Sequence, residues 1–380
     1  MKIVIATDSM KGSLSSLEAG EAIRKGIARI APEAQILVRP LADGGEGTVE
    51  ALVPGMNGIL QSITVTGPLG KPVRCEYGIL PATGTAILEM SSAAGITLLD
   101  KTERNPLDTT TYGVGEFIRD AIGKKCRHFI IGIGGSATND GGIGMLQALG
   151  FGMLDRNGNQ VPRGARGLAA IDHITDDKAL SELSACEFRI ACDVTNPLCG
   201  SQGCSQIFGP QKGADSEMIR KMDQWLSHYA MLCHARYPFS DQDAPGSGAA
   251  GGLGFAFRTF LHADLTSGVR LILEETHLED YLADADLVIT GEGRLDAQSA
   301  MGKAPIGVAG LAKKYGIPVI ALAGCVTENA TICNQYGIDA FFPILHQPVT
   351  LEEAMEPEAA RKNLTLTAEQ VFRLISHYSS

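Results

Sequence analysis

The sequence predicts an α/β protein in which a Rossmann-like parallel-sheet domain is interrupted by a second, inserted α/β domain. Three observations lead to this prediction. The chain opens with a strand–helix–strand pattern, the same pattern returns after residue 285, and the segment at residues 60–90 has the pattern of a hairpin instead. We therefore predict a discontinuous domain formed by residues 1–62 and 285–380, with an inserted domain at residues 63–284.

The first strand–helix–strand unit is predicted from apolar spacing and from one helix-capping signal. Residues 2–6 and 35–39 are short apolar runs of strand length. Between them, Ser15 and Glu18 have the spacing of a capping box, and apolar residues then recur at helical spacing until Pro32. Two strands joined by a helix indicate the beginning of a parallel sheet.

The rest of the chain divides into a middle part and a C-terminal part. Residues 63–66 and 74–79 are predicted strands that a turn at residues 67–70 joins into a hairpin. The other expected elements are a helix at 115–122, a strand at 127–131, a strand at 286–290, a helix at 305–315, a strand at 319–323, a strand at 340–344 and a closing helix at 364–377.

Composition and charge narrow the functional class. Of the 380 residues, 44% are hydrophobic and 20% are charged, which is ordinary for a folded protein. The formal net charge of −11 argues against general nucleic-acid binding, but a few local cations could still bind an anionic substrate. The sequence begins without a signal-peptide core, no run is long enough to span a membrane, and the nine cysteines form no regular framework. We expect a cytoplasmic protein with reduced thiols.

Four segments combine glycine with carboxylate or hydroxyl groups, mostly where a predicted strand ends. Glycine adopts positive φ and lets the backbone approach a ligand, and the N–H groups of a following helix bind anions. Four such segments in one chain indicate an enzyme that handles a phosphorylated ligand. They are residues 42–48, 132–142, 245–252 and 291–296.

The end of the first predicted strand carries Asp8, Ser9 and Lys11. Ligands of open α/β sheets collect at the carboxyl ends of strands. Lys11 could contact a carboxylate or phosphate there, and Ser9 could donate a hydrogen bond. An ordinary β–α turn with an exposed lysine explains the same residues about equally well.

Asp43 and Glu46 place two carboxylates in a glycine-rich backbone after the second predicted strand. Oxygen ligands of this kind suit Mg²⁺, which usually takes only one or two protein carboxylates together with phosphate oxygens. The alternative is a glycine-rich turn whose carboxylates cap a helix.

Two further segments offer a carboxylate and a pair of cations. Asp193 follows a plausible strand and could be a general base or a metal ligand, or it could merely cap the turn at Asn196 and Pro197. Arg294 offers a bidentate fork for a carboxylate or phosphate, and Lys303 is a second candidate for binding an anion. A solvated loop is the alternative, and it fits the lysine better than the arginine.

A nicotinamide-dependent oxidoreductase is the second reading of the glycine segments. Gly132 to Ala137 fits the G-x-G-x-x-A pattern after a strand, with Asp155 downstream. Residues 139–142 are poor helix formers where the binding helix should continue, and the other three glycine segments would have no task. Residues 245–252 could lie against a nucleotide, although they lack the Gly-Lys-Ser/Thr of a Walker A loop.

Taken in order, these segments resemble the bacterial glycerate kinase family of the type I class, from residue 1 to about residue 344. The chain departs from the family pattern at Thr7 and Met10, where the family usually has a proline and an aromatic residue, but it retains Asp8, Ser9 and Lys11. The segments that carry the resemblance are residues 42–48, 131–142, 192–198, 208–213 and 289–294.

The resemblance implies ATP-dependent phosphorylation of D-glycerate to 2-phosphoglycerate in a two-domain α/β enzyme, with its active site in the cleft between the domains. Phosphorylation at the 3-hydroxyl remains an alternative because both hydroxyls belong to one small molecule. A non-catalytic sugar-acid sensor is a third reading, and the absence of a basic helix-turn-helix pattern places it last.

In-line phosphoryl transfer needs positioning and charge neutralisation, so we assign the candidate residues to these tasks. ATP and Mg²⁺ are the expected cofactors, and D-glycerate is the expected substrate. We expect no nucleic-acid or membrane partner, and the sequence makes no prediction about the oligomeric state. The expected catalytic residues are Asp193 as the base, Lys11 and Asp43; the substrate-binding residues are Asp8, Ser9, Arg294, Asp296 and Lys303; the nucleotide-binding residues are Gly134, Gly135, Ser136, Asn139, Gly246, Gly248 and Gly251; and the metal ligands are Glu46 and Asp140.

Overall fold

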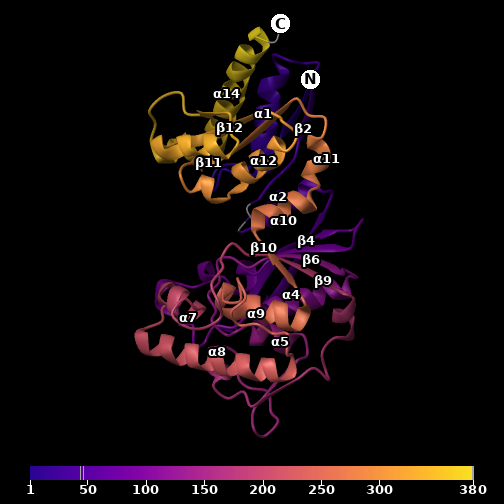
Figure 1. Cartoon of the computed structure of the whole chain (residues 1–380), viewed down its shortest axis with the longest axis vertical. Helices are drawn as coiled ribbons and strands as arrows, with labels where there is room; N and C mark the ends of the chain where they lie inside the picture. The colour runs from indigo at the N-terminus through magenta and orange to yellow at the C-terminus, as the bar shows by residue number, and fades with distance from the viewer. Residues whose placement is uncertain (43, 46, 379–380) are drawn as a thin grey trace. The chain divides into compact units, whose positions relative to one another are not determined.

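The computed structural model describes residues 1–42, 44–45 and 47–378, and its chain divides into two compact α/β units. Unit 1 comprises Met1–Asp43, Glu50–Met56 and Val269–Ser380, and unit 2 comprises Gly44–Val49 and Asn57–Gly268. Figure 1 shows the two ends of the chain, indigo and yellow, in the same unit. The division falls at other positions than the predicted 62/63 and 284/285, because residues 57–62 begin a strand of unit 2 and residues 269–282 form helices of unit 1.

Unit 1 is built from five strands and the helices that follow them. Its elements, with α2 and α10 beginning in unit 2, are β1 (Lys2–Ile5), α1 (Ser16–Ala28), β2 (Gln35–Val38), α2 (Thr48–Gly55), α10 (Gly268–Glu275), α11 (Leu278–Leu282), β11 (Leu287–Leu295), α12 (Ala304–Lys313), β12 (Val319–Val326), β13 (Ala340–Pro343), α13 (Leu351–Met355) and α14 (Pro357–Tyr378).

The sheet of unit 1 is parallel throughout, in the order β13-β12-β11-β1-β2. This confirms the predicted parallel sheet and gives it the flavodoxin-like strand order. The order reverses between β1 and β11, whose carboxyl ends therefore form the switch point at which open α/β sheets bind ligands. The capping box predicted at Ser15 and Glu18 is present at the start of α1.

Strand β11 is longer than the predicted strand at residues 286–290. It continues to Leu295, with Arg294 paired in register with Cys325 of β12, so most of the expected loop at 291–296 is strand. Glycines make this possible because the two backbones approach closely. A Cβ atom on Gly291 would lie 2.0 Å from the carbonyl oxygen of Leu322, and one on Gly324 would lie 2.3 Å from that of Gly293.

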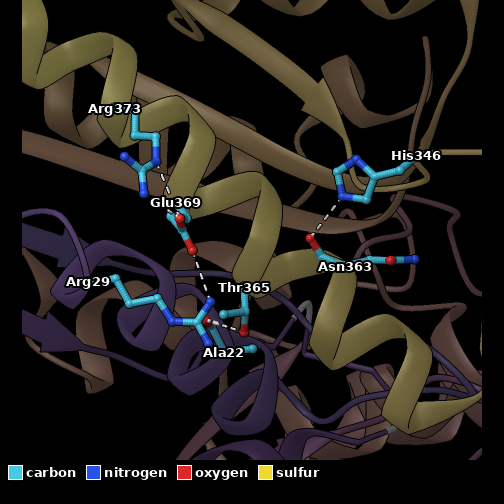
Figure 2. Close-up of polar contacts among 7 residues, drawn as sticks. All are labelled: Ala22, Arg29, His346, Asn363, Thr365, Glu369 and Arg373. Carbon is cyan, nitrogen blue, oxygen red and sulfur yellow. Dashed lines mark hydrogen bonds and ion pairs between the residues drawn. The ribbon is translucent and has the colours of Figure 1, made fainter.

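Helices α1 and α14 pack together on the core of unit 1, although they lie at opposite ends of the sequence (Figure 1). Figure 2 shows Arg29, which caps the C-terminus of α1, and Arg373 of α14 on either side of Glu369, with the Arg29 Nη1 to Glu369 Oε2 distance at 2.9 Å. The Thr365 hydroxyl donates to the carbonyl oxygen of Ala22 at 2.9 Å. This close approach depends on Gly26, where an added Cβ would lie 2.2 Å from the Thr365 carbonyl oxygen.

Unit 2 contains a hairpin followed by alternating strands and helices. Its elements are β3 (Ile59–Thr66), β4 (Pro72–Leu80), β5 (Thr85–Glu89), α3 (Ser91–Ala94), α4 (Tyr112–Gly123), β6 (His128–Gly132), α5 (Ile143–Ala148), β7 (Gly152–Leu154), α6 (Ala165–Leu168), β8 (His173–Thr175), β9 (Glu187–Ala191), α7 (Cys204–Phe208), α8 (Ser216–Arg236), α9 (Ala249–Leu261) and β10 (Asp264–Thr266).

The six-stranded sheet of unit 2 has the order β10-β9-β6-β5-β4-β3. Strands β3, β4 and β5 are antiparallel neighbours, which confirms the predicted hairpin, whereas β5, β6, β9 and β10 run parallel. Phe129 of β6 and Phe188 of β9 stack with ring centroids 4.8 Å apart in the core. The carboxyl ends of β6 and β9 therefore lie next to each other, and the segments after both strands begin at the same edge.

Among the described residues, no helix is long and apolar enough to cross a membrane.

Candidate active site

Each unit contains a pocket whose walls include residues singled out from the sequence. The unit-1 pocket has a volume of about 550 Å³ and the unit-2 pocket one of about 370 Å³. Both lie where parallel strands end, as expected for open α/β sheets.

The unit-1 pocket lies at the switch point between β1 and β11. Six sequence-predicted residues line it together, although they come from three separate segments: Asp8, Ser9, Lys11, Arg294, Asp296 and Lys303. The opposite wall is apolar and includes Ile344, Leu351 and Met355. Only the fold brings the N-terminal and C-terminal segments to one edge.

Charges of both signs line the unit-1 pocket. Asp8 is 7% exposed, and its Oδ1 accepts the backbone N–H of Ser9 at 2.7 Å. Arg294 Nε lies 3.3 Å from Asp296 Oδ2, and Lys303 Nζ lies 3.7 Å from Glu292 Oε2. Carboxylates therefore orient two cations at this pocket, where a local positive charge could attract an anion.

One wall of the unit-2 pocket is formed by the segment that follows β6. Gly134 and Gly135 are exposed, Gly135 has a φ of +70°, and a Cβ on Gly134 would meet no atom within 4 Å. The Ser136 side chain lines the same pocket. Three of the seven predicted nucleotide-binding residues therefore lie at this pocket.

Asp193 lines the unit-2 pocket from the segment after β9. Its Oδ1 accepts the backbone N–H of Gly268, the first residue of α10, at 2.9 Å. The carboxylate is exposed, and the hydrogen bond from Gly268 holds one of its oxygens in place. A carboxylate held in this way can accept or orient a hydroxyl proton.

Lys212 is a residue of the unit-2 pocket that the sequence reasoning missed. It ends the short turn Pro210–Lys212, is 2% exposed, and donates from Nζ to Ser136 Oγ at 2.8 Å and to the Thr138 carbonyl oxygen at 2.6 Å. Burial lowers the pKa of Lys212 to about 8. Its segment, residues 208–213, is part of the family resemblance, and a lysine directly before Gly213 is the available signal.

Asp140, expected as a metal ligand, lies inside unit 2 and lines neither pocket. Its Oδ2 accepts from the backbone N–H and hydroxyl of Thr111, at 2.8 and 2.9 Å, and its Oδ1 accepts from Gly142 at 3.1 Å. Burial raises the pKa of Asp140, and these hydrogen bonds oppose the rise. Both carboxylate oxygens of Asp140 thus accept hydrogen bonds from the protein and stabilise the loop, and its predicted role as a metal ligand stays a prediction.

The other four expected nucleotide-binding residues also support loops instead of lining the pocket. Asn139 is buried and its Nδ2 donates to Ser205 Oγ at 2.8 Å. Added Cβ atoms on Gly248 and Gly251 would lie 2.2 Å from the Pro197 carbonyl oxygen and 2.1 Å from that of Thr138, and Gly246 has a φ of +87°. These glycines are needed because three loops pack backbone against backbone, while Ala249 and Ala250 between them reach the pocket.

Two expected carboxylates, Asp43 and Glu46, lie outside the described residues, so their predicted roles stay predictions. Within the described part of the chain, no group of three or more histidine, cysteine, aspartate or glutamate residues could hold a metal.

The dinucleotide reading of Gly132 to Ala137 does not fit the local structure. A binding helix should follow the glycines directly, but residues 133–142 are non-helical and α5 then has only six residues. Asp155 lies in a turn, where its Oδ1 accepts the backbone N–H groups of Asn157 and Asn159, both at 2.9 Å. Asp155 therefore stabilises this turn.

Comparisons with known proteins agree with the resemblance stated from the motifs. The model of the glycerate kinase family matches residues 3–376. The Escherichia coli protein named Glycerate 2-kinase is 49% identical over 354 residues, 93% of each chain, and the Haemophilus influenzae protein named Glycerate kinase is 46% identical over 99% of each chain. A crystal structure from Salmonella typhimurium LT2, provisionally named glycerate kinase 2, is 47% identical with a TM-score of 0.93 and covers 100% of this chain and 99% of that one. A family match and relatives of this similarity over nearly the whole length establish that the chain belongs to the glycerate kinase family.

Proposed function

We propose that the protein transfers the γ-phosphoryl group of ATP directly to the 2-hydroxyl of D-glycerate. The observation that carries the proposal is the unit-2 pocket, where Gly134, Gly135 and Ser136 share a cavity with the carboxylate of Asp193. Loose phosphoryl transfer needs donors for phosphate oxygens and a group that orients the attacking hydroxyl, and this pocket offers both. The name of the Escherichia coli relative supports the 2-position.

We assign the triphosphate to the unit-2 pocket and the carboxylate of D-glycerate to the unit-1 pocket. Backbone N–H groups in a glycine segment suit phosphate oxygens, whereas an arginine fork suits a carboxylate. Asp193 is the group that we propose orients the attacking hydroxyl.

Mg²⁺ is the proposed companion of ATP, and it would neutralise charge on the phosphate oxygens. It usually takes only one or two protein carboxylates, so a dedicated three-residue cluster is not needed. Of the described carboxylates, Asp193 is the one that lines the unit-2 pocket, while the oxygens of Asp140 already accept protein hydrogen bonds. We therefore assign Asp193 to the hydroxyl and keep Glu46 as the candidate magnesium ligand.

The reaction and its position are tested together by ³¹P NMR of the purified protein with ATP, Mg²⁺ and D-glycerate. We expect the resonance of 2-phosphoglycerate. A resonance of 3-phosphoglycerate would support kinase activity but would show that the 3-hydroxyl is the acceptor. If the folded protein formed no phosphoester, the proposed function would be wrong.

Replacing Arg294 by Met is expected to raise the KM for D-glycerate about 10- to 100-fold, with a smaller change in the KM for ATP, because a charge-assisted hydrogen bond contributes about 1.5–3 kcal/mol. Steady-state kinetics with each substrate varied in turn would measure this. Arg294→Lys keeps the positive charge but loses the bidentate guanidinium, so its KM for D-glycerate should lie between those of the wild type and Arg294→Met. An unchanged KM for D-glycerate in Arg294→Met would remove this residue from the substrate site.

A further inference from the structure

Lys212 is a cation that unit 2 buries at the edge of its pocket. The residue is 2% exposed, yet it lines the unit-2 pocket beside Gly134, Gly135 and Ser136. An ammonium group carries three N–H donors, and two of them reach Ser136 Oγ and the Thr138 carbonyl oxygen. No protein partner is present for the third donor among the described residues.

The partners of Lys212 are neutral, which makes its burial costly. No carboxylate of the described residues lies within ion-pair distance of its Nζ, and the nearby Asp140 uses its oxygens for Thr111 and Gly142. Buried charges in proteins are normally paired, because removing a lone ion from water costs several kcal/mol. A protein keeps such a group where a ligand supplies the opposite charge.

We infer that Lys212 is the cation that binds the anionic group of the ligand in the unit-2 pocket, and that Ser136 holds its ammonium group toward that ligand. This inference rests on the proposed function for the identity of the ligand, which under our assignment is the triphosphate of ATP. Both substrates carry negatively charged oxygen atoms that an ammonium group binds. The carboxylate of D-glycerate is therefore the alternative ligand of Lys212.

The neighbouring groups suit the binding of oxygen anions. Ser136 accepts from Lys212 through Oγ, so its own hydroxyl proton is available to donate onward. Gly134 and Gly135 are exposed at the same pocket and leave room for a phosphate or carboxylate to approach the backbone. A compact ammonium point charge beside such a segment is a common way to bind phosphate.

The test is calorimetric binding, without turnover, of ATP with Mg²⁺ and of D-glycerate, each alone, to the full chain and to Lys212→Met. We expect the affinity for ATP to fall about 10- to 100-fold, as for the loss of one charge-assisted hydrogen bond. The control is Lys221→Met, which removes an exposed lysine of α8 paired with Glu217 and should bind as the wild type does.

The outcomes separate the two ligands and the two proposals. If only the affinity for D-glycerate fell, Lys212 would still be the anion-binding cation, but D-glycerate would bind in the unit-2 pocket and ATP in the unit-1 pocket. Equal affinities of wild type and folded Lys212→Met for both ligands would overturn the inference, as would binding of neither ligand to the wild type. The proposed function fails separately, if the wild type binds a ligand through Lys212 but forms no phosphoglycerate.

The pH dependence of binding to the wild type provides a second test that needs no folded variant. Because burial lowers the pKa of Lys212 to about 8, its ammonium form is lost as the pH rises through this value. The titratable groups that face it are Asp140, Cys204 and, across the pocket, Cys192 and Asp193; burial raises the pKa of Cys204 to about 11 and also raises that of Cys192.

Affinity for ATP should therefore fall about tenfold between pH 8 and pH 9.5, where the triphosphate itself no longer titrates. Affinity that stays level over this range would contradict the inference. Ser136→Ala should weaken binding through the same ammonium group, and a wild-type affinity in that variant would show that Ser136 does not position it.

Discussion

Replacing Asp193 by Asn is expected to lower kcat for D-glycerate phosphorylation by about 10²- to 10⁴-fold while the fold is retained, because general-base assistance contributes about this much. Asn keeps the oxygen that accepts the Gly268 N–H, so this tether remains while the basicity and the charge are lost. Steady-state kinetics and circular dichroism on the same preparation would measure both effects.

A matched control is Asp215→Asn, because Asp215 also accepts a backbone N–H, that of Met218 at the start of α8, but lies at neither pocket. This variant should keep the wild-type kcat. Asp193→Ala also removes the hydrogen bond to the Gly268 N–H. A larger fall in kcat for Asp193→Ala than for Asp193→Asn would measure the contribution of positioning. A wild-type kcat in folded Asp193→Asn would remove this residue from the reaction.

Replacing Gly26 by Ala is expected to lower the free energy of unfolding by about 1–3 kcal/mol, although alanine is the better helix former. The added Cβ would lie 2.2 Å from the Thr365 carbonyl oxygen and 3.0 Å from the Cβ of Ala368, so α1 and α14 must move apart. Overpacking of this kind typically costs about 1–3 kcal/mol. Thermal and urea unfolding monitored by circular dichroism would detect it.

The control for this prediction is Gly310→Ala in α12, where the helix is exposed and an added Cβ meets no atom within 4 Å. That variant should be more stable than the wild type by up to about 1 kcal/mol, because alanine reduces the freedom of the unfolded chain. Opposite signs for the two glycines would establish that helix packing decides the effect at Gly26. If both substitutions stabilised the protein, the close approach of α1 and α14 would not limit stability.

Local patterns in the sequence were sufficient for the elements whose signals are local. The capping box at Ser15 and Glu18 begins α1, and the turn at 67–70 joins β3 to β4. The lengths of β11 and β12 were underestimated because glycine and charged residues usually end strands, whereas here Gly291 and Gly324 allow two parallel backbones to approach.

The candidate site shows the same division between local and non-local information. Asp8, Ser9, Lys11 and Arg294 could be named from strand ends, and the fold places them at one pocket. Asn139, Asp140 and the glycines of the 245–252 segment have equally suggestive residue types, but contacts with Ser205, Thr111 and Pro197, distant in sequence, turn them inward. Long-range contact also explains why the sequence does not single out Lys212, since its partner Ser136 is 76 residues away.

Short-range spacing and the order of the motifs are enough to indicate the α/β class, the family resemblance and the strand ends at which polar groups gather. Which of those groups reach a pocket and which support a loop follows from contacts between segments that are distant in sequence. The physical reason is that a polar side chain is satisfied by whichever donor or acceptor the fold brings near it. For Asp140 that neighbour is Thr111, and for Lys212 it is Ser136 at the edge of a cavity.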